Sequence, residues 1–401
     1  MKVKILPSKA NGTVVAPPSK SMAHRALICA SFTEKSRVSQ IGKSRDVDVT
    51  LDCLEKLGAR IERVEDGVII GGFKPRDIPD GSKIYCHESG STLRFFIPLC
   101  MLGKGKTYIS GAPRLMERPL TVYETLAEEL GIDFSLKDGI LTVGGGLKAG
   151  DYSVDGGISS QFITGLLLAL SCIPEKSTLT VTGKFESASY VDLTLSALKT
   201  FGKTVVRSNN TYEINPDTSF ASTDYTVEGD WSSSAFLDAL KLIGGSVRVK
   251  GLNEDTLQGD AIYRSFYKRL ARGYYTYDLS DCPDLAPILF ALASVLHGGE
   301  FTGTARLKIK ESDRAEAMRE ELAKIGCDIT VEENRVIIPK AKLHPPTVPI
   351  SSHNDHRIAM AMGVILTLLG GEIEGAEAVT KSYPSFWVTL TELQIGLEFY
   401  A

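Results

Sequence analysis

The sequence predicts an α/β protein of two domains, and three observations support this prediction. First, a chain of 401 residues is too long for one ordinary hydrophobic core, so two domains of about 200 residues are expected. Second, six times along the chain a turn of small polar residues runs directly into an apolar helix. Third, β-like stretches such as VIIGG and LTVTG lie between these helices. Three of the six units would fit into each domain.

The six repeat helices have starts rich in Gly, Ser, Asp and Asn, and several are apolar on nearly every face, which predicts that they are buried. The repeats are expected at 17–30, 87–100, 155–170, 228–242, 281–293 and 352–366. Amphipathic helices are expected between them at 49–57, 120–130 and 315–325. Helix N-termini attract anions, because their N–H groups are unsatisfied and the helix dipole is positive there. Ordinary capping explains such starts equally well, so a binding function depends on the charged residues placed at them.

Composition and charge exclude several classes of protein. The net charge of −4 argues against a nucleic-acid-binding protein that relies on bulk positive charge. The N-terminus lacks the apolar segment of a signal peptide, and the longest apolar run, 358–369, is too short to span a bilayer. The seven cysteines show no CxxC motif or zinc-ligand spacing. Reduced core thiols in the cytoplasm are therefore expected.

The first motif that carries chemistry is SKSMAHR at residues 19–25. Lys20 is expected at the mouth of a helix, with Ser21 and Arg25 four residues apart on one face. Surface cations usually belong to a solvated face, but this segment continues into the apolar sequence ALICASF. The motif therefore favours an anion site beside a buried helix.

The second motif is ESGSTLR at residues 88–94. Gly90 between two serines would let a ligand approach backbone N–H groups closely, although a Gly-Ser turn is weak evidence by itself. Arg114 and Arg118 follow and could bind a carboxylate or phosphate through two parallel hydrogen bonds.

The third motif is the trio Ser159, Ser160 and Gln161 at the start of the most apolar helix. A helix cap explains one serine but not all three polar side chains. Ser187 and Tyr190 could add hydroxyl donors from the following unit.

The fourth motif is KIKESDR at residues 308–314. Lys310 and Arg314 are expected to share a helical face, with Glu311 beside Lys310. A salt-bridged surface helix and a Lys–Glu pair that transfers protons beside an anion-binding Arg are both compatible with this pattern.

The fifth motif is Asn354-Asp355-His356-Arg357, again at the start of an apolar helix. A metal site is one interpretation, but the sequence shows no recognisable third ligand, so a His–Arg anion site is favoured. Lys381 in TKSYP is a single lysine with no local pattern around it.

Together the motifs resemble the EPSP synthase family of enolpyruvyl transferases. PPSKSxxxR, SGSTxR, RxxERPL, SSQF, SxxYxD, CPD, KESDR, NDHR and KSYP occur in the order found in that family and cover almost the whole chain. The resemblance implies two domains, each built from three βαβαββ units around buried helices. It implies one domain at 18–227 and another that joins 1–17 to 228–401, with the active site in the cleft between them.

The resemblance also implies the reaction and the residues that perform it. The family transfers the enolpyruvyl group of phosphoenolpyruvate to the 5-hydroxyl of shikimate 3-phosphate and releases phosphate, in the shikimate pathway of aromatic amino-acid biosynthesis. The residues implied for catalysis are Asp284, Glu311 and Lys20. Those implied for shikimate 3-phosphate are Lys20, Ser21, Arg25, Ser159, Ser160, Gln161, Ser187, Tyr190, Asp284 and Lys310. Those implied for phosphoenolpyruvate are Lys20, Gly90, Arg118, Gln161, Arg314, Arg357 and Lys381. No metal or organic cofactor is implied, and a cytoplasmic monomer that binds neither nucleic acid nor membrane is expected.

Two alternatives and two departures accompany this interpretation. The related transferases that act on UDP-N-acetylglucosamine carry a reactive Cys on a loop over the phosphoenolpyruvate site, and no Cys lies near Arg114–Arg118 here. A non-catalytic anion-binding module on the same scaffold would not need a proton-transfer pair. Glu88 stands where many members of the family carry Asn, and Arg306 stands where some members carry Asn. Neither residue is therefore assigned as a ligand.

Overall fold

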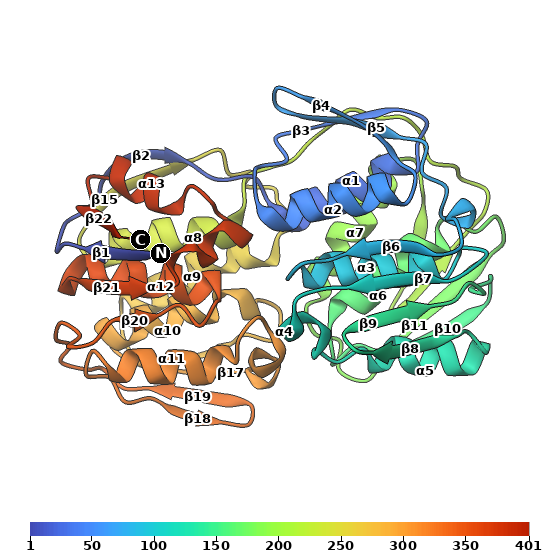
Figure 1. Ribbon diagram of the computed structural model, residues 1–401. Coiled ribbons are helices and arrows are strands. Elements are labelled where there is room, and N and C mark those ends of the chain that lie inside the picture. Colours follow the sequence, from blue (N-terminus) through green and yellow to red (C-terminus); the bar gives the residue numbers. More distant parts are fainter. Residues whose placement is uncertain (401) are drawn as a thin grey trace. The chain divides into compact units, whose positions relative to one another are not determined.

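The computed structural model describes residues 1–400 and divides into two compact units (Figure 1). Unit 1 consists of Met1–Pro17 and Gly229–Ala401, and unit 2 consists of Pro18–Glu228. Each unit has its own hydrophobic core. Both units combine helices with mixed sheets, which confirms the predicted α/β class.

Unit 2 contains three four-stranded sheets with one common strand order. In each sheet a parallel pair forms one side, and two antiparallel pairings continue from it to the other edge. The sheets are β14-β3-β5-β4, β6-β7-β9-β8 and β10-β11-β13-β12. Their strands are β3 (Ser36–Ser39), β4 (Arg60–Val64), β5 (Gly67–Gly71), β6 (Ser82–Tyr85), β7 (Thr107–Ser110), β8 (Phe134–Lys137), β9 (Ile140–Val143), β10 (Asp151–Asp155), β11 (Ser177–Thr182), β12 (Val205–Ser208), β13 (Thr211–Ile214) and β14 (Tyr225–Thr226).

Three helices of unit 2 are buried and three are amphipathic. The buried helices are α1 (Lys20–Ser31), α3 (Gly90–Cys100) and α6 (Ser160–Leu170), and α3 packs against α6. The others are α2 (Arg45–Lys56), α5 (Thr121–Leu130) and α7 (Ala188–Thr200), with a short helix α4 (Pro113–Met116) and a 3₁₀ turn at Pro75–Asp77. Helix α2 begins before the predicted residue 49, because the Ser44 side chain accepts a hydrogen bond from Val47 N–H and caps the helix there.

Unit 1 repeats the same strand order twice and a shortened form of it once. The four-stranded sheets are β16-β17-β19-β18 and β20-β21-β1-β22, and the third sheet is the parallel pair β15-β2. The strands are β1 (Lys2–Ile5), β2 (Asn11–Val15), β15 (Ser246–Lys250), β16 (Thr276–Asp278), β17 (Gly299–Thr302), β18 (Thr330–Glu332), β19 (Arg335–Ile338), β20 (Ile350–Ser351), β21 (Gly371–Glu374) and β22 (Leu397–Tyr400).

The N-terminal strands complete repeats that otherwise belong to the end of the chain. Strand β1 lies between β21 and β22 and is antiparallel to both, and the blue N-terminal ribbon accordingly runs among red elements in Figure 1. Strand β2 pairs in parallel with β15. In unit 2, β14 similarly completes the sheet of β3. Each unit is therefore assembled from segments that lie far apart in the sequence.

Buried helices also form the core of unit 1, and one of them begins within the predicted NDHR motif. They are α8 (Trp231–Leu242), α10 (Ala286–Val295) and α12 (His356–Leu369), and α12 packs against both of the others. The remaining helices are α9 (Tyr263–Leu270), α11 (Arg314–Ala323) and α13 (Phe386–Glu392), with 3₁₀ turns at Gly259–Ile262, Pro283–Leu285, Ala305–Ile309 and Ala376–Lys381. Among residues 1–400, no helix has both the length and the apolar character needed to cross a bilayer.

Candidate active-site residues in the two units

Lys20 begins α1 and forms an ion pair with the start of α2. Its Nζ lies 2.7 Å from Oδ2 of Asp46, and the two side chains are 17% and 12% exposed. The ammonium group is therefore near the surface of unit 2 and already balanced by a carboxylate. Sequence reasoning identified Lys20 but not Asp46, because the pairing joins two helices.

Arg25, one turn further along α1, is buried and is held by oxygen atoms of α1 and α7. Its guanidinium donates to the Ser21 carbonyl at 2.6 Å, to the Tyr190 carbonyl at 2.9 Å and to Thr194 Oγ1 at 2.9 Å. Burial lowers the pKa of Arg25 to about 10. Arg25 therefore holds α1 against α7 and brings together three residues predicted for shikimate 3-phosphate: Ser21, Arg25 and Tyr190.

Gly90, Arg118 and Gln161, all predicted for phosphoenolpyruvate, meet around the buried Arg94. Nη1 of Arg94 donates to Gln161 Oε1 at 3.0 Å, and Gln161 Nε2 donates to Ser91 Oγ at 3.1 Å. A β-carbon at Gly90 would lie 2.7 Å from Nη1 of Arg118 and 3.2 Å from Nη1 of Arg94. The absence of a side chain at Gly90 therefore lets two guanidinium groups approach the start of α3.

The serines predicted for shikimate 3-phosphate lie at two further helix starts. Ser159 caps α6 by accepting a hydrogen bond from Gln161 N–H at 3.3 Å, and Ser160 is the first residue of that helix. Ser187 precedes α7 with a positive φ of 57°, a conformation that is uncommon outside glycine. The hydroxyls of unit 2 therefore stand at starts of helices, where anions are favoured.

A buried chain of hydroxyls, which sequence reasoning missed, links these helix starts. His24 Nδ1 lies 2.7 Å from Thr50 Oγ1, which lies 2.8 Å from Thr92 Oγ1, which lies 2.7 Å from Ser89 Oγ. Burial lowers the pKa of His24 well below its ordinary value, and Lys20 and Arg25 lower it further. A neutral His24 thus joins α1 and α2 to the Ser89 cap of α3.

In unit 1, the carboxylate of Asp284 is the meeting point of three cations. Its Oδ1 lies 2.8 Å from Arg314 Nη1 and 3.5 Å from Lys310 Nζ, and its Oδ2 lies 2.7 Å from Arg357 Nη2. Arg357 also donates to Ser232 Oγ at 2.7 Å. The structure therefore gathers four predicted site residues that are as much as 73 positions apart.

Arg314 binds two further carboxylates on its other sides. Its Nη2 donates to Glu311 Oε2 and its Nε donates to Asp355 Oδ2, both at 2.8 Å, and its side chain is 1% exposed. Asp355 also caps α12 by accepting from Arg357 N–H at 2.9 Å. Asp355 is thus a structural partner of two predicted ligands, and the NDHR motif already contained it.

Lys381 joins the same neighbourhood through the backbone. Its side chain is buried, and its Nζ donates to the carbonyl of Asn354, the residue before Asp355. All the site residues predicted in unit 1 therefore lie in contact with one another or with the segment 354–355.

The charges of this cluster change the pKa values of its members. Burial alone would raise the pKa of Asp284, but Arg357, Lys310 and Arg314 hold it well below its ordinary value. Burial lowers the pKa of Lys310 to about 8, although the nearby Asp284 favours the protonated form. Asp284 is consequently ionised and a poor proton acceptor while it binds all three cations.

One geometric prediction was wrong. Lys310 and Arg314 do not share a helical face, because α11 begins at Arg314, where the Asp313 side chain caps it by accepting from Glu316 N–H at 3.2 Å. Lys310 ends the preceding 3₁₀ turn in an extended conformation. The two cations meet at Asp284 through tertiary structure. Arg306, left unassigned, donates to the Ser280 carbonyl at 2.5 Å.

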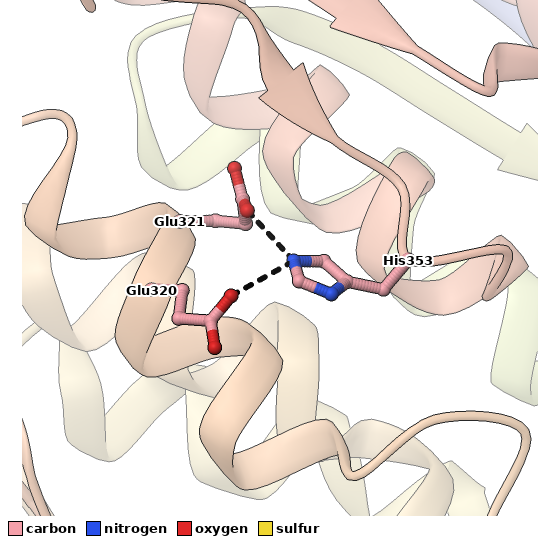
Figure 2. A group of neighbouring side chains, drawn as sticks. All are labelled: Glu320, Glu321 and His353. Carbon is pink, nitrogen blue, oxygen red and sulfur yellow. Dashed lines mark hydrogen bonds and ion pairs between the residues drawn. The ribbon is translucent and has the colours of Figure 1, made fainter.

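A cluster of Glu320, Glu321 and His353 was also missed by sequence reasoning. Figure 2 shows the imidazole of His353 facing both carboxylates, which come from α11. One possible metal-ligand atom from each of the three side chains lies within 4.8 Å of the other two. Because 32 positions separate Glu321 from His353, no local motif could have revealed this contact.

The fold and the clustered cations are those of an α/β protein that binds small anions. Residues 6–390 match the family described as EPSP synthase (3-phosphoshikimate 1-carboxyvinyltransferase), and the chain belongs to this family. Relatives named 3-phosphoshikimate 1-carboxyvinyltransferase from Clostridium beijerinckii and Clostridium kluyveri are 38% and 39% identical, each over 96% of this chain and 95% of the relative. An EPSP synthase structure from Acinetobacter baumannii, 23% identical, superposes with a TM-score of 0.75 over 99% of this chain and all of that one, which shows the same fold.

Proposed function

We propose that this protein transfers the enolpyruvyl group of phosphoenolpyruvate to the 5-hydroxyl of shikimate 3-phosphate, giving 5-enolpyruvylshikimate 3-phosphate and inorganic phosphate. Membership of the family supports this reaction. The single structural observation that carries the proposal is the Asp284 cluster, in which one carboxylate is surrounded by Lys310, Arg314 and Arg357. Such a cluster offers both anion-binding cations and a group that can accept a proton.

The proposed reaction has two steps. The 5-hydroxyl oxygen bonds to C2 of phosphoenolpyruvate, its proton leaves, and C3 takes up a proton, so that a tetrahedral adduct forms. The adduct then loses a proton from C3 and the C2–phosphate bond breaks, which releases inorganic phosphate. Asp284 accepts the hydroxyl proton, and Glu311 and Lys20 transfer the proton at C3. Each general acid–base contact contributes on the order of 10²–10⁴-fold in rate.

Anion binding would increase the basicity of Asp284. Phosphoenolpyruvate carries a carboxylate and a phosphate, which compete with Asp284 for the guanidinium groups of Arg314 and Arg357. When these groups turn toward the substrate, the attraction that lowers the pKa of Asp284 weakens, and its pKa rises. The arriving substrate would thus prepare the base that the reaction needs.

The remaining polar residues are proposed to hold the two substrates. For shikimate 3-phosphate we assign residues at the helix starts of unit 2 together with Asp284 and Lys310. For phosphoenolpyruvate we assign Lys and Arg side chains of both units together with Gly90 and Gln161. The first set is Lys20, Ser21, Arg25, Ser159, Ser160, Gln161, Ser187, Tyr190, Asp284 and Lys310. The second set is Lys20, Gly90, Arg118, Gln161, Arg314, Arg357 and Lys381. We further propose that the enzyme is a cytoplasmic monomer that needs no cofactor.

The decisive experiment measures phosphate release from phosphoenolpyruvate with and without shikimate 3-phosphate. Release that requires shikimate 3-phosphate is expected. The same assay is repeated with UDP-N-acetylglucosamine in place of shikimate 3-phosphate. Release of phosphate only with UDP-N-acetylglucosamine would assign the protein to the related transferases, and no release with either compound would favour an anion-binding module. Each of these two results would contradict the proposal.

A further inference from the structure

His353 connects the segment before α12 to the side of α11. Its Nε2 lies 2.7 Å from Oε1 of Glu321 and 3.7 Å from Oε2 of Glu320. Figure 2 shows the imidazole directed toward both carboxylates. The Glu321 side chain is 1% exposed, whereas the imidazole is 25% exposed. A buried carboxylate requires such partners, because burial of an unpaired charge is costly.

Glu321 is fixed by two other groups in addition to His353. Lys324 Nζ donates to both carboxylate oxygens, at 3.0 and 2.7 Å, and Ser351 N–H donates to Oε2 at 2.9 Å. The carboxylate oxygens of Glu320 and Glu321 and the imidazole nitrogen of His353 lie within 4.8 Å of one another, which is also the arrangement of a possible metal site. Since Lys324 already supplies a positive charge to Glu321, the cluster is better described as an ion-paired anchor.

The anchored segment has an unusual backbone. His353 and Asn354 follow each other with φ values of 48° and 51°, a left-handed conformation that non-glycine residues adopt only where the surroundings fix it. Their N–H groups donate to Ser351 Oγ at 3.1 Å and Ser352 Oγ at 3.2 Å. These local bonds and the contact with Glu321 together determine the path of the chain.

This backbone positions two of the proposed phosphoenolpyruvate ligands directly. The carbonyl of Asn354 accepts the hydrogen bond from Lys381 Nζ. The next residue, Asp355, binds Nε of Arg314 at 2.8 Å and caps the helix that carries Arg357. A change in the backbone torsion angles of His353 or Asn354 would therefore displace the groups that hold Lys381 and Arg314.

We propose that His353 and Glu321 form a positioning pair that holds residues 353–355 in the conformation that orients Lys381 and Arg314 toward phosphoenolpyruvate. This inference rests on the proposed function and extends it to two residues that do not contact the substrate. The pair acts through the backbone of the segment, so it affects binding of phosphoenolpyruvate more than the chemical step.

The pair also makes this binding depend on pH. The hydrogen bond to Glu321 raises the pKa of His353 above its ordinary value, although burial opposes the shift. The charged groups that face the imidazole are Glu320, Glu321 and Lys324, all from α11. Since the raised pKa belongs to the folded state, the contribution of the ion pair is fully present below about pH 6.5. It is lost as the pH rises through the raised pKa.

The test compares His353→Gln with the wild-type enzyme, and His297→Gln, at an exposed histidine of the same unit, serves as the matched control. At pH 6.5, His353→Gln is expected to raise KM for phosphoenolpyruvate about threefold to tenfold, the effect of losing a partly exposed hydrogen bond of ordinary net strength. Its kcat and its KM for shikimate 3-phosphate should stay within about twofold. The ratio of KM for phosphoenolpyruvate in His353→Gln to that in the wild-type enzyme should approach one as the pH rises. Glu321→Gln should behave like His353→Gln.

Three outcomes would overturn the proposal. An unchanged KM for phosphoenolpyruvate would show that the pair positions nothing, and equal increases of both KM values with a lower Tm would show general loosening. An effect of EDTA on the wild-type enzyme equal to that of His353→Gln would show a metal site. If the wild-type enzyme has no turnover, the proposed function fails independently. Calorimetric binding of inorganic phosphate to the same variants at pH 6.5 and 8.5 then tests the pair by itself.

Discussion

Replacing Asp284 by Asn removes one negative charge from the point where Lys310, Arg314 and Arg357 meet. The nearest cationic atoms lie 2.7, 2.8 and 3.5 Å from its two carboxylate oxygens. Glu311 and Asp355 still neutralise Arg314 in the variant. The repulsion between the Arg357 and Lys310 charges, however, is no longer compensated by Asp284.

The structure sets the expected loss of stability. Breaking a fully buried ion pair by removing one partner costs about 3–5 kcal/mol. Because the Asp284 side chain is 20% exposed and Asn retains one oxygen acceptor, we expect a loss of about 2–3 kcal/mol after allowance for solvent screening. For a domain of about 200 residues this corresponds to a decrease in Tm of roughly 4–12 °C.

An anion should restore much of this stability. In the wild-type protein, phosphate has to compete with Asp284 for the three cations, whereas in Asp284→Asn it takes the place of the missing charge. If its affinity rises about tenfold, saturating phosphate stabilises the variant by about 1.4 kcal/mol more than the wild type. Turnover should nevertheless fall by about 10²–10⁴-fold, because the proposed base is lost.

Thermal unfolding at increasing phosphate concentration measures the first effect, and release of phosphate from phosphoenolpyruvate, in a phosphate-free buffer, measures the second. Asp255→Asn makes the same charge change at an exposed position of the same unit and should alter neither measurement. If Asp284→Asn unfolds at the wild-type temperature and phosphate stabilises both proteins equally, Asp284 does not balance the cations and the reasoning is refuted.

Three further predictions concern single residues. Gly90→Ala should raise KM for phosphoenolpyruvate about tenfold without unfolding the protein, because the new methyl group would lie 2.7 Å from the far end of the Arg118 side chain and displace it. An unchanged KM in initial-rate measurements would contradict this. Lys20→Met should abolish turnover while the unfolding free energy changes by about 1 kcal/mol, since only the partly exposed pair with Asp46 is lost. If calorimetry shows a loss of stability as large as that of a core truncation, Lys20 has a structural role. Because the pKa of Lys310 is about 8, it loses its charge above that pH, and KM for shikimate 3-phosphate should then rise; in Lys310→Arg this rise should be absent up to pH 10.

The fold class could be predicted from the sequence because its signal is local and repeated. Each buried helix has a polar start and apolar sides, and both properties can be read within about 15 residues. The order of the strands could not be predicted in this way. Strand β1 pairs with β21 and β22, and nothing local to residues 2–5 specifies partners at the other end of the chain.

The candidate site shows the same limit. Sequence motifs identified Asp284, Arg314 and Arg357 separately, and the structure shows that they touch. Spacing alone gave a wrong face for Lys310, because the preceding 3₁₀ turn ends at Lys310 and α11 begins only after the Asp313 cap. The contact of His353 with Glu321 was not predictable, since 32 positions separate the two residues and no local motif links them. The assignment of individual ligands stays a prediction.

The cations proposed to bind substrates all have partners within the folded chain, and this affects both stability and selectivity. Lys20 is balanced by Asp46, while Arg314 and Arg357 are balanced by Asp284. Without these carboxylates, the clustered positive charges would repel one another and destabilise each unit. A ligand that binds has to replace several carboxylate contacts at once. A substrate bearing both a carboxylate and a phosphate has more oxygen atoms and more negative charge with which to replace these contacts than a small monoanion has. The internal carboxylates would therefore weaken binding of common small anions more than binding of phosphoenolpyruvate, and would contribute to specificity through competition.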